Sequence, residues 1–156
     1  MLLSLICWIG GLIFFAFVLA PTVFNIPAVL PNTHLAGNVV RSTLSKLHWI
    51  AIVAGIVYLI SSMIYSRLLD GTVHIFALRH VLLYFMLGLT FVSQFLVIPR
   101  MDKLRTAVGD FSALAVDNPL RVQFDALHVW STRVEVVVLL LGLVAVYATA
   151  NALSQR

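Results

Sequence analysis

The sequence predicts an all-α integral membrane protein that folds as a four-helix bundle. Hydrophobic residues make up 62% of the 156 residues and charged residues only 10%, whereas soluble proteins average about 45–50% and about 25%. The apolar residues form four continuous runs, each near the ~20 residues that a helix needs to cross a ~30 Å hydrocarbon core. This composition excludes a secreted mini-protein and a disordered chain. The net charge of +4 then indicates membrane topology and contact with anionic lipids, and no nucleic-acid partner is expected.

A single membrane domain covering residues 1–156 is expected, with spans at about 2–24, 48–66, 75–98 and 126–153. Pro21 should kink or end the first span, because proline lacks a backbone N–H. That span is too long for the apolar core of a signal peptide. It contains Cys7, the only cysteine, so an intrachain disulfide is excluded.

Two long connections and one short turn are expected between the spans. Residues 25–47 and 99–125 form the long connections, the second one starting at Pro99 and containing an interfacial helix over about 101–116. A turn at Asp70-Gly71 joins the second and third spans, and an amphipathic segment from about Leu120 leads into the fourth. Small residues in the spans, such as Gly11, Gly55 and Gly142, should let the helices approach closely.

The basic residues predict how the bundle is oriented. Four crossings place both termini on one side and both long connections on the other. The side of the long connections carries six basic residues against three on the opposite side, with Arg133 left out because it lies inside the fourth span. Positive charge favours the cytoplasm, so the long connections should be cytoplasmic and the termini outside, in a bacterial inner membrane. The six are Arg41, Lys46, Arg100, Lys103, Arg105 and Arg121.

Polar residues inside the spans gather at the end of the bundle where the long connections lie. Ionisable groups in a span are costly, so each needs a partner or a function. On the fourth span His128, Ser131 and Glu135 share one helical face, and Glu135 should face the bundle. The other helices contribute residues at the same depth, and the whole candidate cluster is His48, Gln94, Arg100, His128, Ser131, Arg133 and Glu135.

Each polar group has a structural and a functional interpretation. Glu135 could fix the helix register through Arg133 or His48, or handle protons or a ligand. His48 and His128 could ligate haem or copper from two helices, but polar packing is the favoured interpretation because no metal-binding spacing accompanies them. Arg79 and His80 begin the third span and point about 100° apart. We therefore expect them to reach the headgroups and not to share a site.

Several motifs resemble the bacterial relatives of transmembrane protein 205, a group catalogued as a domain of unknown function. They cover the chain from end to end and comprise Trp8-Ile-Gly-Gly11, Phe14-Phe15, Pro21-x-x-Phe24, Ile98-Pro-Arg-Met101, Leu104-Arg105 and Phe124-x-x-x-His128-x-x-Ser131. The resemblance implies a four-helix integral membrane protein and supplies no established reaction. Glu135 departs from the pattern, because some relatives carry an uncharged polar residue there.

Three functional hypotheses follow from these observations. The first is a structural or binding component of the membrane, not an enzyme, whose polar cluster organises the bundle, a partner contact or a lipid site. The second is a haem- or metal-binding redox protein that uses His48 and His128. The third is a proton-coupled transport component that uses Glu135. The expected partners are the lipid bilayer and either further copies of the chain or other subunits of a membrane complex.

Overall fold

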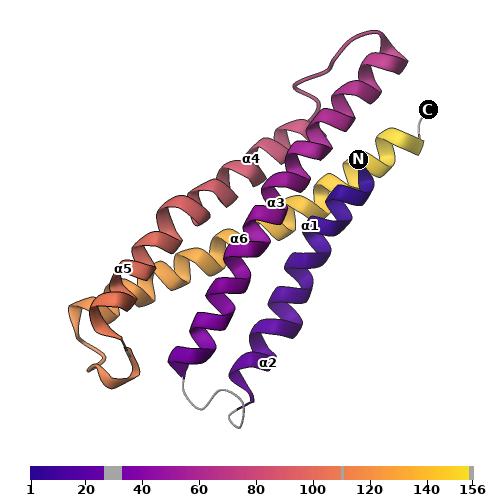
Figure 1. Ribbon diagram of the computed structural model, residues 1–156. Coiled ribbons are helices and arrows are strands. Elements are labelled where there is room, and N and C mark those ends of the chain that lie inside the picture. The colour runs from indigo at the N-terminus through magenta and orange to yellow at the C-terminus, as the bar shows by residue number, and fades with distance from the viewer. Residues whose placement is uncertain (27–32, 110, 155–156) are drawn as a thin grey trace.

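Four long helical rods form an elongated bundle in the computed structural model (Figure 1), which describes residues 1–26, 33–109 and 111–154. The first rod comprises α1 (Leu2–Phe14), η1 (Phe15–Leu19) and α2 (Ala20–Phe24), and the second is α3 (Thr33–Asp70). The third comprises α4 (Leu78–Val92), η2 (Ser93–Val97) and α5 (Ile98–Val108). A short η3 (Phe111–Ala113) precedes the fourth rod, α6 (Pro119–Ser154). The all-helical prediction is confirmed.

Four helices of the described residues are long and apolar enough to cross a membrane, and many of their large hydrophobic side chains are exposed on the outside of the bundle. Such a coat suits lipid and not water. The start of α1 and the end of α6 lie at the end of the bundle that carries the α3–α4 turn, and the end of α2, the start of α3 and the end of α5 lie at the opposite end (Figure 1). We call this opposite end of the bundle the long-connection end.

The helices extend further than the sequence predicts. Residues 33–47, expected within a loop, are the first turns of α3, whose 38 residues span about 57 Å at 1.5 Å per residue. Pro99, expected to start a loop, lies inside a helix that continues to Val108. The hydrocarbon core is only ~30 Å thick, so the additional turns bring polar side chains beyond it at the long-connection end.

The first and third rods each contain a π-helical turn shortly before a proline, Pro21 and Pro99 respectively. In η1 the backbone N–H of Ala20 donates to the carbonyl of Phe15, and in η2 that of Ile98 donates to Ser93. Each turn stands directly before a proline, where a regular helix would press the ring against the carbonyl four residues earlier. The wider turn relieves this contact, so Pro21 neither ends nor breaks the first rod.

The middle of the bundle is an apolar, closely packed layer. Its side chains are all at most 1% exposed and come from every rod, namely Trp8, Ala51, Leu83, Met86 and Val138. Glycines bring the helices together as expected, since a Cβ on Gly142 would collide with Ile9, and one on Gly55 would press on Leu87 and Trp8. We call this the apolar layer; it separates the polar groups at the two ends.

Candidate functional site

The candidate site centres on His48, which is 1% exposed in the middle of α3. Its Nε2 lies 2.7 Å from Glu135 Oε1 on α6, and its Nδ1 lies 3.0 Å from Gln94 Oε1 on η2. The Glu135 side chain is only 15% exposed. One imidazole therefore connects three of the four rods, and its plane is fixed by a hydrogen bond at each ring nitrogen.

Neighbouring hydroxyl groups complete this network. Ser93 Oγ donates to Glu135 Oε1 over 3.3 Å, and Gln94 Nε2 donates to Ser45 Oγ over 3.0 Å. Adjacent residues of a regular helix point about 100° apart, yet Ser93 and Gln94 are both buried and each reaches a different partner. Both belong to the π-turn η2, so the distortion that accommodates Pro99 also supplies two polar side chains to the site.

The contact between His48 Nε2 and Glu135 Oε1 places one proton between the two atoms, on the ring or on the carboxyl group. The other ring nitrogen donates to the Gln94 amide oxygen or accepts from the amide nitrogen, depending on the tautomer. The imidazole can therefore satisfy the buried Glu135 carboxyl group and the Gln94 amide at the same time.

Glu135 also lines a cavity of about 320 Å³ between the first rod, the start of α3, α5 and α6. Its walls are mostly apolar, and they include Leu12, Phe15, Ala16, Met101 and Leu139. The polar part is contributed by Arg41, Arg105, His128, Ser131, Thr132 and Glu135. The volume is at the lower end of the range for ligand pockets, and an apolar wall with a few converging polar groups is typical of them.

Two arginines hold the long-connection end of the cavity. Arg41 makes a bidentate ion pair with Asp102, with Nε–Oδ1 at 2.5 Å and Nη2–Oδ2 at 2.8 Å. Arg105 donates from Nη1 to the backbone carbonyl of Gly37 over 3.1 Å and to Asn38 Oδ1 over 3.2 Å. Its guanidinium lies 5.1 Å from the ring centre of Phe124, a cation–π distance. These contacts connect α5 with α3 and α6.

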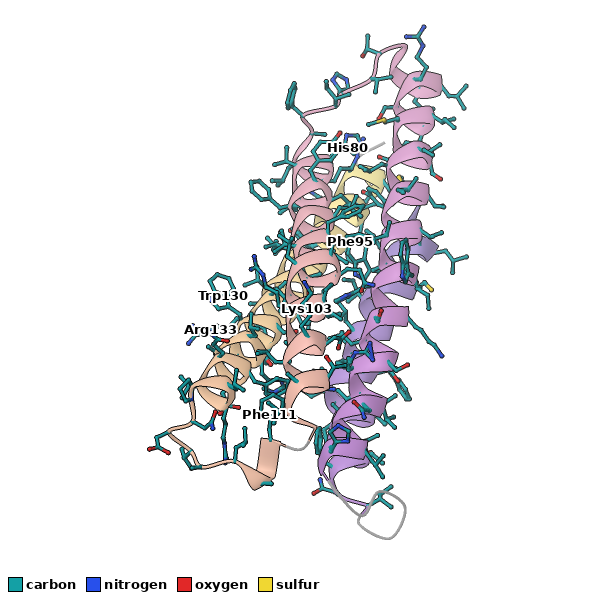
Figure 2. The ribbon with its side chains drawn as sticks, turned by 60° about the vertical axis from the view of Figure 1, so that its left-hand side comes forward. His80, Phe95, Lys103, Phe111, Trp130 and Arg133 are labelled. Carbon is teal, nitrogen blue, oxygen red and sulfur yellow. The ribbon has the colours of Figure 1, made fainter. Side chains whose placement is uncertain are left out.

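The structure brings some of the predicted site residues together and separates others. His48, Gln94 and Glu135 are in direct contact, and Ser131 and His128 line the cavity that Glu135 borders. Arg100 and Arg133 are exposed and lie outside this network; Figure 2 shows Arg133 with Trp130 on the outer side of α6. Of the two partners considered for Glu135, Arg133 and His48, the structure shows His48.

The donor set does not fit the haem or copper interpretation. Both nitrogens of His48 are engaged by hydrogen bonds, so the buried ring offers no lone pair to a metal. Within the part of the chain that the structure describes, no group of three or more His, Cys, Asp or Glu side chains is placed to hold a metal ion. We therefore derive no chemistry through such a group.

A second buried polar cluster lies at the opposite end, and here the sequence prediction was wrong. Arg79 and His80 are 9% and 0% exposed, and both contact the same hydroxyl, Ser62 Oγ, at 3.1 and 2.7 Å. Arg79 also donates to Ser66 Oγ, and His80 Nδ1 donates to the backbone carbonyl of His74. His80 is labelled in Figure 2, between α3 and α4. Ser62 and Ser66 lie one turn apart on α3, a spacing that could have indicated a partner for these residues.

The sequence model of one family, described as "Domain of unknown function (DUF4149)", matches residues 3–109. This range includes the first three rods with His48 and Gln94, and it ends before α6 with Glu135. No curated protein and no solved structure matches the chain.

Proposed function

The chain belongs to the family described as domain of unknown function (DUF4149), and we propose that this integral membrane protein binds an amphipathic molecule of the bilayer in the cavity beside Glu135. One observation carries the proposal. The Glu135 carboxyl group borders an apolar cavity while one of its oxygens is fixed by His48 and Ser93. Placing a carboxyl group inside a membrane span costs free energy. Ligand binding would give Glu135 a function in addition to holding the helices together.

The apolar walls support a ligand from the membrane. Ala16 and Ala20 of the first rod line the cavity, and short side chains there leave room that a larger residue would fill. The same polar network also connects three rods, so it serves as a structural element of the bundle and as the support of the site. Such a support holds a polar group rigidly enough to orient a ligand.

Native mass spectrometry of protein extracted together with its lipids tests this function. The wild-type protein should retain a bound amphiphile, whereas Ala16→Trp should lower its occupancy by about tenfold because the indole fills the cavity. Ala20→Leu provides a second, milder obstruction. Val18→Trp is the matched control, because Val18 is 48% exposed on the same rod and does not line the cavity. Equal occupancy in the wild-type protein and all three variants would refute the proposal.

A second candidate function is a proton-coupled transport component that uses Glu135. The direct contact between His48 Nε2 and Glu135 Oε1 favours it, because a proton could be exchanged between such groups and a ligand that enters the adjoining cavity. Glu135→Gln keeps the size of the side chain and removes the exchange. If the chain supports uptake or resistance in cells, this variant should abolish it while the protein still folds and binds its ligand. Unchanged uptake would exclude this candidate.

The subgroup to which the protein belongs, the membrane that contains it and its orientation there are further parts of the proposal. We infer a transmembrane protein 205-like member of the bacterial inner membrane, with the termini outside and the long connections cytoplasmic, supported by the six-to-three distribution of basic residues. Association with further copies or with other membrane subunits fits so small a bundle. Cysteine labelling tests the orientation: in a Cys7→Ser background, an impermeant reagent should label Gly71→Cys in whole cells and leave Asn118→Cys unlabelled.

A further inference from the structure

The cavity has a polar end and an apolar end along the axis of the bundle. On α6 its lining runs from His128 to Leu139, about 16 Å at 1.5 Å per residue. His128 lies toward the long-connection end, as do Arg41 and Arg105 on the neighbouring helices. Leu12, Phe15 and Leu139 line the part nearer the middle of the bundle. This is the order of polar and apolar groups in the adjacent leaflet of a bilayer.

The two arginines at this end have different partners. Arg41 is paired with the carboxylate of Asp102. Among the described residues, the hydrogen-bond acceptors of Arg105 are neutral, namely a backbone carbonyl and an amide oxygen. The Arg105 guanidinium therefore lines the polar end of the cavity without a carboxylate as its direct hydrogen-bond partner in this part of the chain.

The size of the cavity limits what can enter. A volume of about 320 Å³ is near the lower limit of the roughly 300–1,000 Å³ that ligand pockets have. This size suits a small headgroup with the first part of one chain better than the two chains of a complete phospholipid.

Resting on the function proposed above, we infer that the ligand is a single-chain anionic lipid from the leaflet at the long-connection end. Its negatively charged head lies near Arg105, and its chain follows the wall formed by Ala16, Phe15 and Leu12. Arginine suits this role because its planar guanidinium binds carboxylates and phosphates through two parallel hydrogen bonds. The carbonyl of Gly37 and Asn38 hold the guanidinium in place for this contact.

Binding to protein in phosphatidylcholine nanodiscs tests the inference. Oleoyl lysophosphatidylglycerol, with one net negative charge, is compared with oleoyl lysophosphatidylcholine, which has the same chain and no net charge. The wild-type protein should bind the anionic lipid at least about tenfold more tightly, and Arg105→Gln should remove this preference. Oleate at pH 8.5 forms a third arm, which shows whether a carboxylate replaces the phosphate.

Lys103→Gln is the matched control, because it removes one positive charge from the same helix at an exposed position outside the cavity lining; it should keep the preference. Arg105→Lys should retain part of it, which guards against loss of folding in Arg105→Gln. Equal binding of the two lysolipids by the wild-type protein would refute the preference for an anionic headgroup, but it would not contradict the proposed function. An equal loss in Arg105→Gln and Lys103→Gln would assign the preference to general surface charge and also overturn the inference. Binding of none of these lipids would refute both proposals.

Discussion

His48 and Glu135 are 87 positions apart in the chain, yet their side chains meet at 2.7 Å inside the bundle. The contact joins α3 to α6, two helices that are not consecutive in the sequence. Removing one partner of a buried pair leaves the other charged or polar and without compensation. The pair should therefore contribute to stability as a unit, and a double-mutant cycle is the appropriate measurement.

We expect His48→Ala to lower the free energy of unfolding by about 3 kcal/mol, because it leaves the Glu135 carboxyl group without its main partner. The double variant His48→Ala/Glu135→Ala should recover part of this loss, with a coupling energy of about 1 kcal/mol or more. Reversible unfolding in mixed micelles gives the four values of the cycle. Additive effects of the two substitutions would contradict the contact.

Asp102→Asn should have a much smaller effect, although Arg41 and Asp102 are joined by a hydrogen bond and a second ionic contact. Their side chains are 40% and 31% exposed, so water and salt screen the interaction, and exposed pairs contribute about 0–1 kcal/mol. The difference between the variant and the wild-type protein should shrink further as the salt concentration rises. A loss as large as that in His48→Ala would show that Asp102 is effectively buried.

Ser62→Ala should destabilise the opposite end of the bundle by about 1–3 kcal/mol, because it removes the hydroxyl that both Arg79 and His80 contact. Ser61→Ala is the control at the preceding position, which is less buried and should change stability by less than about 0.5 kcal/mol. Thermal unfolding followed by circular dichroism compares the two variants. Equal melting temperatures would show that the shared hydroxyl contributes nothing.

Two glycine substitutions should have opposite outcomes. Gly142→Ala should cost about 1–3 kcal/mol, because the new methyl group collides with Ile9, and Ile9→Ala in the same chain should relieve part of the clash. Gly88→Ala meets nothing within 4 Å and should be neutral or stabilising by up to about 1 kcal/mol, since alanine favours a helix over glycine. Equal destabilisation by both variants would contradict the close approach of α1 and α6.

The apolar runs were sufficient to predict four helices, but not how far the helices extend. The first turns of α3 contain Asn38 and Arg41. The sequence pattern predicts a loop at these residues, because the residues that stabilise their helical conformation are distant in the sequence. Asn38 receives a hydrogen bond from Arg105, and Arg41 pairs with Asp102. Tertiary contacts of this kind stabilise polar helical turns that local pattern alone does not predict.

The sequence predicts only those residues of the candidate site whose position follows from their depth in the membrane and from the helix face on which they lie. Glu135 and His48 share a depth, and both face the bundle. Gln94 reaches the ring from η2, and no rule of regular helices predicts that Ser93 beside it also points inward. Arg79 and His80 show the same limit, because long side chains from adjacent positions converge on Ser62 despite the 100° between them.

The apolar layer formed by Trp8, Ala51, Leu83, Met86 and Val138 has an electrical consequence. A transmembrane voltage falls most steeply where the dielectric constant is lowest, and a full crossing is worth about 2.3 kcal/mol per elementary charge at 100 mV. The His48–Glu135 pair lies on the long-connection side of this layer. A charged ligand that reaches the pair from the long-connection end therefore crosses only part of the field. Ligand occupancy of the cavity should depend weakly on the membrane potential and strongly on the lipid composition of the leaflet at that end.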